Sequence, residues 1–302
     1  MAGIQEISAG LQFPEGPIAM PDGSILLVEI QRGTLTRVLP DGAQKIAARL
    51  GGGPNGAALG PDGRVYVCNN GGFQWHRVGE HVYPGHQPED YAGGSIQRVD
   101  LATGEVETLY THCGGHPLRG PNDIVFDAEG GFWFTDLGKT RARDLDWGGL
   151  YYARPDGGSI REVVYPLLSP NGVGLSPDGR RLYVAESLTA RVFAWDLSGP
   201  GQIARAPTGN GGRLLAGVGG LQYFDSLAVD SEGAVCVATI ANGGITRIAA
   251  DGQRVEHFPM PDPLTTNLCF GGSDLRTAYV TLSATGRLVR TRWPVPGIPL
   301  NF

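Results

Sequence analysis

One short pattern returns six times along the 302-residue chain. A carboxylate or carboxamide residue precedes a short apolar stretch, and a turn sequence such as Pro-Asp-Gly ends that stretch; residues 53–64, for example, read GPNGAALGPDGR. The acidic residues of the six turns are Asp22, Asp62, Glu129, Asp178, Glu232 and Asp274. Seven residues before each of them lies an oxygen-bearing side chain: Glu15, Asn55, Asn122, Asn171, Asp225 and Asn267. The repeat therefore holds through most of the chain, at intervals of about 40 residues plus insertions.

Each copy of the repeat reads as four short strands. The second copy has four segments rich in Val, Ile, Leu and Tyr, at residues 56–60, 64–69, 94–100 and 106–110. No segment shows a sustained helical period of apolar residues. Six four-stranded units predict an all-β fold, a six-bladed β-propeller in one domain over residues 1–302. A pair of β-sandwiches is the alternative, but two sandwiches would not give six matching copies.

The six oxygen-bearing side chains should converge. In a propeller blade the strand nearest the axis comes first, so six positions just before the inner strands meet at one mouth of the central channel. Oxygen ligands alone favour a hard divalent cation such as Ca²⁺, Mg²⁺ or Mn²⁺. Asn and Asp also satisfy backbone groups at strand starts. That role explains one or two Asn residues better than it explains Glu15 and Asp225 at the same offset.

Four motifs carry a family resemblance. They are FPEGP at 13–17, GPNDIVFDAEGGFWFTD at 120–136, SPNGVGLSPDGRRLYVAES at 169–187 and FDSLAVDSEG at 224–233. With these motifs in this order, the chain resembles the family of gluconolactonase, senescence marker protein (regucalcin) and luciferin-regenerating enzyme over roughly residues 11–290. The resemblance implies a six-bladed propeller with one divalent cation in its central channel. It also implies four metal ligands: Glu15, Asn122, Asn171 and Asp225, of which Asn122 completes the metal shell or holds substrate in different members.

Several residues have expected roles around the metal. Asp225 is the best general base, and Asp136, at a position where staphylococcal lactonases are similar, either donates a proton to the leaving group or orients Asn122. Gluconolactonase-like members often carry an Arg two residues before the third-blade Asn, whereas here Gly120 holds that place and Arg119 comes one residue earlier. Four residues are candidates for contacts to substrate: Arg119, Trp75, His76 and Tyr223.

The expected reaction is hydrolysis of a small lactone, in particular a sugar lactone, by a metal-activated water. A phosphotriesterase-like hydrolase similar to diisopropyl fluorophosphatase is one alternative, and a non-catalytic binding propeller is another. Two insertions, residues 71–92 and 138–147, fall between the second and third strands of their blades and are expected beside the metal mouth. We expect them to form substrate walls or lids.

Composition narrows the class of partner and the compartment. The net charge of −6 gives no reason to expect nucleic acid or a membrane as partner, and no apolar run reaches the length of a membrane span. The N-terminus shows no secretory signal, and the four cysteines show no CxxC spacing, which favours buried thiols in the cytoplasm. The identity of the cation (Ca²⁺, Mn²⁺, Zn²⁺, Mg²⁺ or Fe²⁺) and the oligomeric state stay open.

Overall fold

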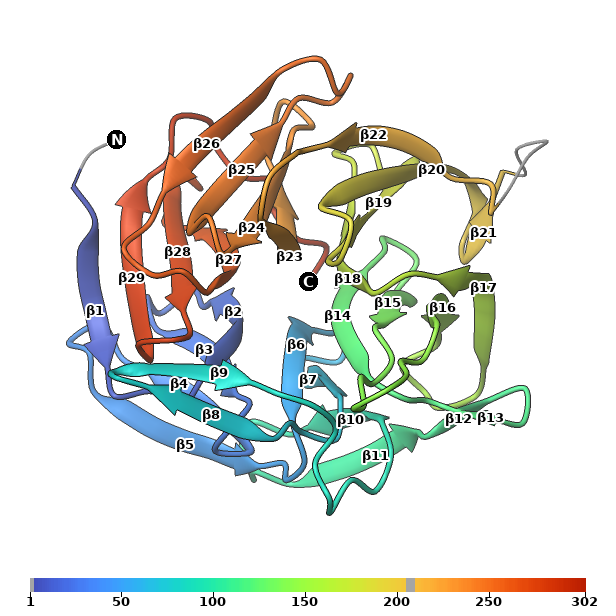
Figure 1. Cartoon of the computed structure of the whole chain (residues 1–302), viewed down its shortest axis with the longest axis horizontal. Helices are drawn as coiled ribbons and strands as arrows, with labels where there is room; N and C mark the ends of the chain where they lie inside the picture. Colours follow the sequence, from blue (N-terminus) through green and yellow to red (C-terminus); the bar gives the residue numbers. More distant parts are fainter. Residues whose placement is uncertain (1–2, 205–209) are drawn as a thin grey trace.

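Six antiparallel sheets stand around a central axis, in chain order (Figure 1). The computed structural model describes residues 3–204 and 210–302. The arrangement confirms the predicted six-bladed β-propeller, with the strand that begins each repeat nearest the axis. The described part of the chain contains no helix long and apolar enough to span a membrane.

The blades follow one another along the chain. Blade one contains β2 (Pro14–Ala19), β3 (Ile25–Glu29), β4 (Thr34–Val38) and β5 (Gln44–Arg49). Blade two contains β6 (Pro54–Leu59), β7 (Val65–Asn69), β10 (Ser95–Val99) and β11 (Val106–Tyr110). Blade three contains β14 (Pro121–Phe126), β15 (Phe132–Asp136), β16 (Gly148–Ala153) and β17 (Ile160–Leu167). Blade four contains β18 (Pro170–Leu175), β19 (Arg181–Glu186), β20 (Arg191–Gly199), β21 (Gln202–Ile203) and β22 (Arg213–Gly217). Blade five contains β23 (Tyr223–Val229), β24 (Val235–Ile240), β25 (Gly244–Ile248) and β26 (Val255–Pro259).

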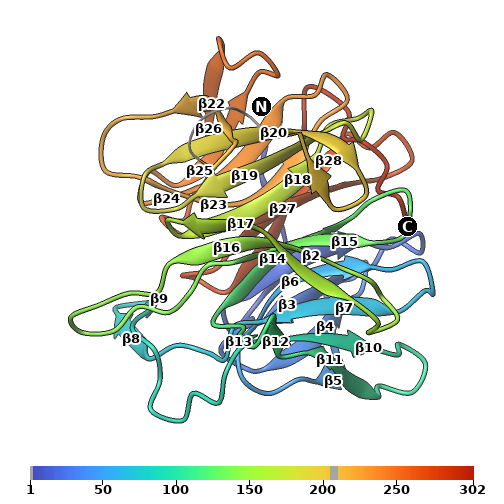
Figure 2. The ribbon, with the colours of Figure 1, turned by 90° about the vertical axis from the view of Figure 1, so that its right-hand side faces the viewer.

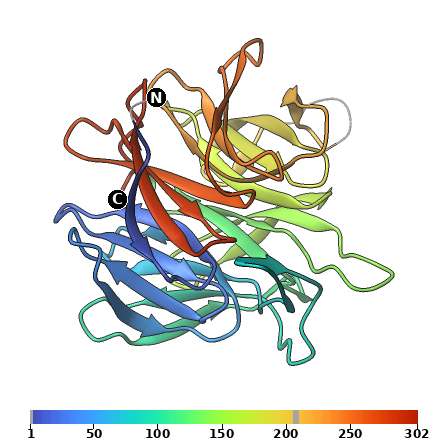
Figure 3. The same cartoon turned by 60° about the vertical axis from the view of Figure 1, so that its left-hand side comes forward.

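Blade six closes the ring with both ends of the chain. It contains β27 (Thr265–Gly271), β28 (Thr277–Leu282), β29 (Arg287–Arg292) and the N-terminal β1 (Gln5–Ala9). In β1, Gln5 pairs with Arg290 and Ala9 with Arg287, so the first strand of the chain completes the last blade (Figure 3). The circle of six blades can therefore close only when two strands about 280 residues apart in the sequence have paired.

The tight turns predicted after each inner strand are present. In blade two the N–H of Gly63 donates to the carbonyl of Gly60 at 3.0 Å, and Asp62 accepts the N–H of Arg64 at 3.1 Å. Asp178 accepts the N–H of Arg180 in the same way in blade four. In blades one, two, four and six the acidic residue of the repeat stabilises the turn, because its carboxylate accepts the backbone N–H two residues on. In blades three and five Asp127 and Asp230 do so instead, and they accept the N–H groups of Glu129 and Glu232.

The hydrophobic core lies between adjacent blades. One cluster joins Trp133 of blade three to Leu182 and Trp195 of blade four, all fully buried. Because each blade buries its faces against its neighbours, the inner strands are held at fixed positions around the axis. The four cysteines are buried and free, as predicted.

Two parts of the chain mark the two faces of the disc. Residues 71–92, the insertion between β7 and β10, contain β8 (Trp75–Val78) and β9 (His81–Pro84), which pair as a hairpin that the sequence did not predict. We call this hairpin the flap. Figure 2 shows the flap on one face and the C-terminus on the opposite face. A smaller hairpin, β12 (His112–Cys113) and β13 (His116–Pro117), precedes blade three.

Candidate active site

A bulge aims the first residues of the inner strands into the channel. In β14, Pro121 pairs with Asp136 and Ile124 pairs with Phe134, so Asn122 and Asp123 lie opposite Thr135 alone. Each of the other inner strands shows a register shift at its own repeat position. Because a bulge bends the strand and turns side chains out of their alternation, it delivers polar side chains to the axis at the point where the strand begins.

The six repeat positions lie at the starts of the inner strands and are all buried; we call this set of side chains the ring: Glu15, Asn55, Asn122, Asn171, Asp225 and Asn267. The four metal ligands predicted from the sequence belong to it. Glu15, Asn122, Asn171 and Asp225 come from blades one, three, four and five. Oε2 of Glu15 accepts hydrogen bonds from Nδ2 of Asn267 at 2.7 Å and from its neighbour Gly16 N at 2.8 Å. Adjacent inner strands run very close together: a Cβ added to Gly172 would lie only 2.7 Å from the carbonyl oxygen of Asp225. The structure therefore brings the ring residues together, with glycine where backbones approach.

Two amide oxygens of the ring are left without partners. Oδ1 of Asn122 and Oδ1 of Asn171 are buried, and neither accepts a hydrogen bond within the described residues. The amide nitrogen of Asn171, in contrast, donates to the Ser187 hydroxyl at 3.0 Å, which leaves its oxygen free to bind another group. A buried acceptor without a partner is costly, so these two oxygens are available to bind a cation, a water molecule or a substrate.

The carboxyl groups of the ring influence one another. Burial raises the pKa of Glu15 to about 7, against the hydrogen bonds from Asn267 and Gly16. Burial, and then the neighbouring Glu15 carboxylate, raise the pKa of Asp225 well above its usual range. The groups that oppose these shifts are hydrogen-bond donors and not cationic side chains. A cation among the carboxylates would favour their ionised forms.

Asp123 is a buried carboxyl residue next to the ring that the sequence analysis missed. It is buried one residue beyond Asn122, and burial followed by the charge of Glu15 raises its pKa to about 7. Its Oδ2 accepts the N–H of Val173 in the next blade at 3.2 Å. The sequence did contain a signal, because the residue after the ring position is Gly in blades one, two and four and is acidic only here.

Asp136 accepts three backbone N–H groups. They come from Arg119 at 2.7 Å, Gly120 at 2.7 Å and Gly138 at 2.9 Å, and the carboxylate is fully buried. Burial raises the pKa of Asp136, and these N–H groups oppose the rise. Of the two predicted roles, proton donor or positioning group, the contacts favour positioning, because the carboxylate is occupied by the loop that leads to Asn122.

The same arrangement recurs in other blades. Glu29 accepts the N–H of Gln12 at 2.6 Å in blade one, and Asn69 accepts the N–H of Gly53 at 2.8 Å in blade two. Glu186 accepts the N–H of Leu168 at 3.3 Å in blade four. Each of these residues ends the second strand of its blade and fixes the chain just before the ring residue, which is a structural role that Asp136 shares.

Comparison with known proteins places the chain in a family. The family model described as the SMP-30/Gluconolactonase/LRE-like region matches residues 13–284. The chain belongs to this family.

Several members and solved structures are similar to it over most of their length. The gluconolactonase of Zymomonas mobilis is 26% identical, with 96% of this chain and 81% of that protein covered. The lactonase drp35 of Staphylococcus saprophyticus is 30% identical, with 83% and 71% covered. The crystal structure of a calcium-binding protein, regucalcin, from Agrobacterium tumefaciens superimposes with a TM-score of 0.78 at 18% identity, over 100% of this chain and 98% of that one, and supports the fold.

The residues predicted to contact substrate lie at different places in this SMP-30/gluconolactonase/LRE-like chain. Arg119 is an exposed residue of the loop held by Asp136. Tyr223 is half-buried at the start of β23, two residues before Asp225. His76 is exposed on the flap, opposite Tyr83. Trp75 is half-buried, and its ring packs against Phe13 at 5.0 Å. The packing of Trp75 fixes the flap to the ring face, because Phe13 lies two residues before Glu15.

Lys139 is a second residue that the sequence reasoning missed. Its ammonium is buried between the two insertions, where Nζ donates to the carbonyls of Asn70 at 2.9 Å and Gly72 at 2.5 Å and lies 4.2 Å from the ring centre of Phe73. Burial lowers the pKa of Lys139 to about 7, opposed by the charge of Asp136. Lys139 thus ties the 138–147 insertion to the base of the 71–92 insertion. No local sequence signal distinguished it from an exposed loop lysine.

Proposed function

We propose that this protein is a metal-dependent lactonase whose substrate is a sugar lactone or a related small cyclic ester. One observation carries the proposal: two buried carboxylates, Glu15 and Asp225, share a ring with the unpartnered oxygens of Asn122 and Asn171. The names of two similar family members, gluconolactonase and lactonase, support the ester bond of a lactone as the bond that is hydrolysed.

The ring fits a divalent cation by the chemistry of its donors. Glu15, Asp225, Asn122 and Asn171 would hold the cation through two anionic and two neutral oxygens, a set suited to Ca²⁺ or Mn²⁺. Across residues 3–204 and 210–302 no three His, Cys, Asp or Glu side chains are grouped as a metal site, so the carboxamide oxygens are needed. When bound, a cation here would polarise the ester carbonyl and lower the pKa of a coordinated water.

The side chains then have separate tasks. Asp225 would accept a proton from the water that adds to the carbonyl carbon. It is a ring carboxylate whose pKa is raised by burial, which makes it a better proton acceptor, and it lies beside the proposed ligand Asn171. The ring C–O bond of the lactone breaks, and the proton returns to the leaving alkoxide to give a hydroxy acid. Asp136 would hold the Arg119–Gly120 loop and so keep Asn122 and the Arg119 side chain in place.

Metal binding and turnover in the same variants test this proposal. We expect Asp225→Ala and Glu15→Ala to abolish lactone hydrolysis, and Asp225→Ala to retain weakened binding of Ca²⁺ or Mn²⁺ in calorimetry. Glu105→Ala, at an exposed carboxylate in the turn between β10 and β11, is the control and should retain turnover. Wild-type turnover in both alanine variants would overturn the site. Cation binding without hydrolysis of any lactone would favour a phosphotriesterase-like enzyme or a binding propeller instead.

A further inference from the structure

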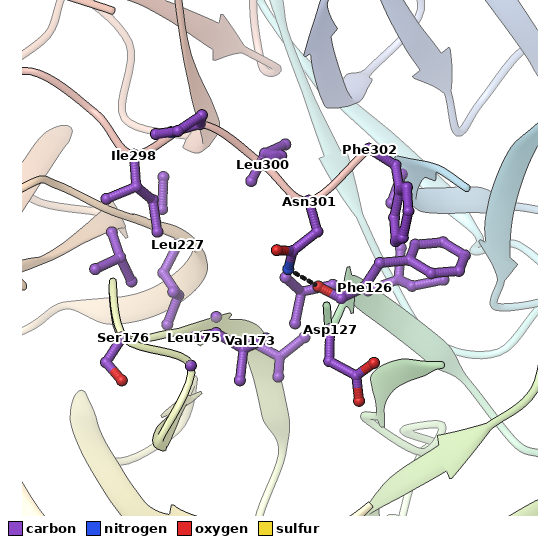
Figure 4. Close-up of a pocket in the computed structure, with 18 of the residues that line it drawn as sticks. Phe126, Asp127, Val173, Leu175, Ser176, Leu227, Ile298, Leu300, Asn301 and Phe302 are labelled. Atoms are coloured by element: carbon purple, nitrogen blue, oxygen red, sulfur yellow. Dashed lines mark hydrogen bonds between the residues drawn. The ribbon is translucent and has the colours of Figure 1, made fainter. Parts of the chain in front are cut away.

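A cavity occupies the central channel on the side of the ring that faces away from the flap. It has a volume of about 640 Å³ and is lined by residues of all six inner strands (Figure 4). The lining extends from Asp123, next to the ring, to the turn residues Asp127 and Ser176 at the far ends of β14 and β18. Because the inner strands run from the ring to these turns, the cavity opens on the face opposite the flap. We call it the distal cavity.

The walls of the distal cavity are mainly hydrocarbon along the strands, and the charged side chains of the lining lie at the turns around its mouth: Asp127, Glu129, Asp178 and Arg180. The six inner strands contribute Ile18, Leu59, Phe126, Leu175, Val229 and Phe270 to the lining. Figure 4 shows Val173, Leu175 and Leu227 grouped along one side. At the inner end, the carboxylate of Asp123 already accepts the N–H groups of Ile124 at 3.0 Å and Val173 at 3.2 Å. A ligand here would therefore be bound chiefly by burial of apolar surface.

The C-terminal tail, residues 297–302, crosses the mouth of this cavity. The N–H of Gly297 donates to the carbonyl of Leu275 at 2.8 Å and anchors the start of the tail. Nearer its end, Nδ2 of Asn301 donates to the carbonyl of Phe126 at 2.8 Å, and the Phe302 ring meets the Phe126 ring edge-on at 5.9 Å (Figure 4). Leu300 between these anchors is 59% exposed. The end of the tail is thus attached by few contacts, which a ligand could displace.

We propose that the distal cavity is a second binding site, for one compact, uncharged molecule with a largely hydrocarbon surface, and that the C-terminal tail covers its mouth. A volume of 640 Å³ falls within the range of pockets for small ligands. Water molecules against the strand walls, away from the polar residues of the mouth, would find few hydrogen-bond partners, so an apolar molecule gains by replacing them there. An inserted peptide is disfavoured, because its N–H and C=O groups would be unpaired among hydrocarbon side chains.

Binding of N-phenyl-1-naphthylamine, an uncharged probe whose fluorescence rises in apolar surroundings, tests this site on the full chain. We expect saturation at one probe per chain. Leu175→Trp fills the cavity and should weaken binding at least tenfold, as should Ser176→Trp at the half-buried rim, which keeps the test valid if the first variant fails to fold. Leu214→Trp is the matched control, because Leu214 is 49% exposed on the outer strand β22, and it should bind like the wild type.

Two results would overturn the second site. The first is no rise in fluorescence up to the solubility limit of the probe, and the second is equal affinity in the wild type, Ser176→Trp and Leu214→Trp. The double variant Asn301→Ala/Phe302→Ala tests the cover separately. Faster association of the probe is expected when the tail is loosened, and an unchanged association rate would remove the tail from the proposal.

Discussion

Asn267 and Glu15 share a hydrogen bond of 2.7 Å, although 252 residues separate them in the sequence. The bond joins the last inner strand to the first at the ring, while β1 joins the same two ends of the chain at the rim of blade six. Closure of the propeller and the orientation of Glu15, a proposed metal ligand, therefore depend on the same region of the molecule.

Replacing Asn267 tests this link. We expect Asn267→Ala to lower the free energy of unfolding by about 1–3 kcal/mol, because a buried carboxylate loses a donor. The affinity for Ca²⁺ should fall about 10- to 100-fold, as for residues that orient a metal ligand. Urea denaturation and calorimetry measure the two effects. Asn55→Ala alters the same kind of ring residue without removing this bond, and equal losses in the two variants would contradict the assignment.

Glu15→Gln should have opposite effects with and without metal. Without a cation, the substitution removes one of several neighbouring buried carboxyl groups and should stabilise the fold by about 1–3 kcal/mol at pH 8. With saturating Ca²⁺ the wild type should be the more stable protein, because it binds the cation more tightly. Thermal unfolding in chelator and in Ca²⁺ gives both comparisons. A variant that is less stable than the wild type in chelator would show that burial of the ionised Glu15 carboxylate does not destabilise the fold.

Two substitutions separate the roles of Asp136. Asp136→Ala leaves three buried N–H groups without their acceptor and should cost about 3 kcal/mol or more of stability. Asp136→Asn keeps one acceptor oxygen, and we expect it to retain part of the wild-type kcat with an unchanged pH–rate profile. If Asp136 is instead the proton donor, Asp136→Asn will remove the alkaline limb of that profile and nearly all turnover.

The pKa of Lys139 predicts how stability changes with pH. Between about pH 7 in the folded state and pH 10.5 in the unfolded state, the unfolded chain binds more protons, so the stability of the wild type should rise with pH. Relative to Lys139→Met, which carries no charge, the gain should be roughly 1–3 kcal/mol over this window. Denaturation of both proteins at several pH values isolates the lysine, because the other titrating groups cancel. A constant difference between the two proteins would show that Lys139 keeps its charge throughout.

The repeat predicted the fold and the ring because both follow from local spacing. Glu15, Asn122, Asn171 and Asp225 each stand at one offset from a turn, and a propeller places equal offsets at equal positions around its axis. The insertion at 71–92 was placed between the correct strands for the same reason.

Features that depend on distant partners escaped the sequence. The N-terminal strand pairs with Arg287 and Arg290, and nothing in residues 5–9 indicates that partner. Lys139 reads as a loop residue until the fold brings it against Asn70 and Gly72. The packing of Trp75 on Phe13 likewise depends on how the flap lies on blade one. In each case the informative contact is set by three-dimensional packing and not by spacing along the chain.

The most direct test of the central claim is acid release from a panel of aldonolactones and simple γ- and δ-lactones, followed with a pH indicator. Chelator-treated protein is compared with the same protein after addition of Ca²⁺, Mn²⁺ or Zn²⁺. We predict that hydrolysis disappears with chelator, returns with at least one cation and is absent in Asp225→Ala under all conditions. Hydrolysis that persists in chelator-treated protein, or no hydrolysis of any lactone with any cation, would contradict the account.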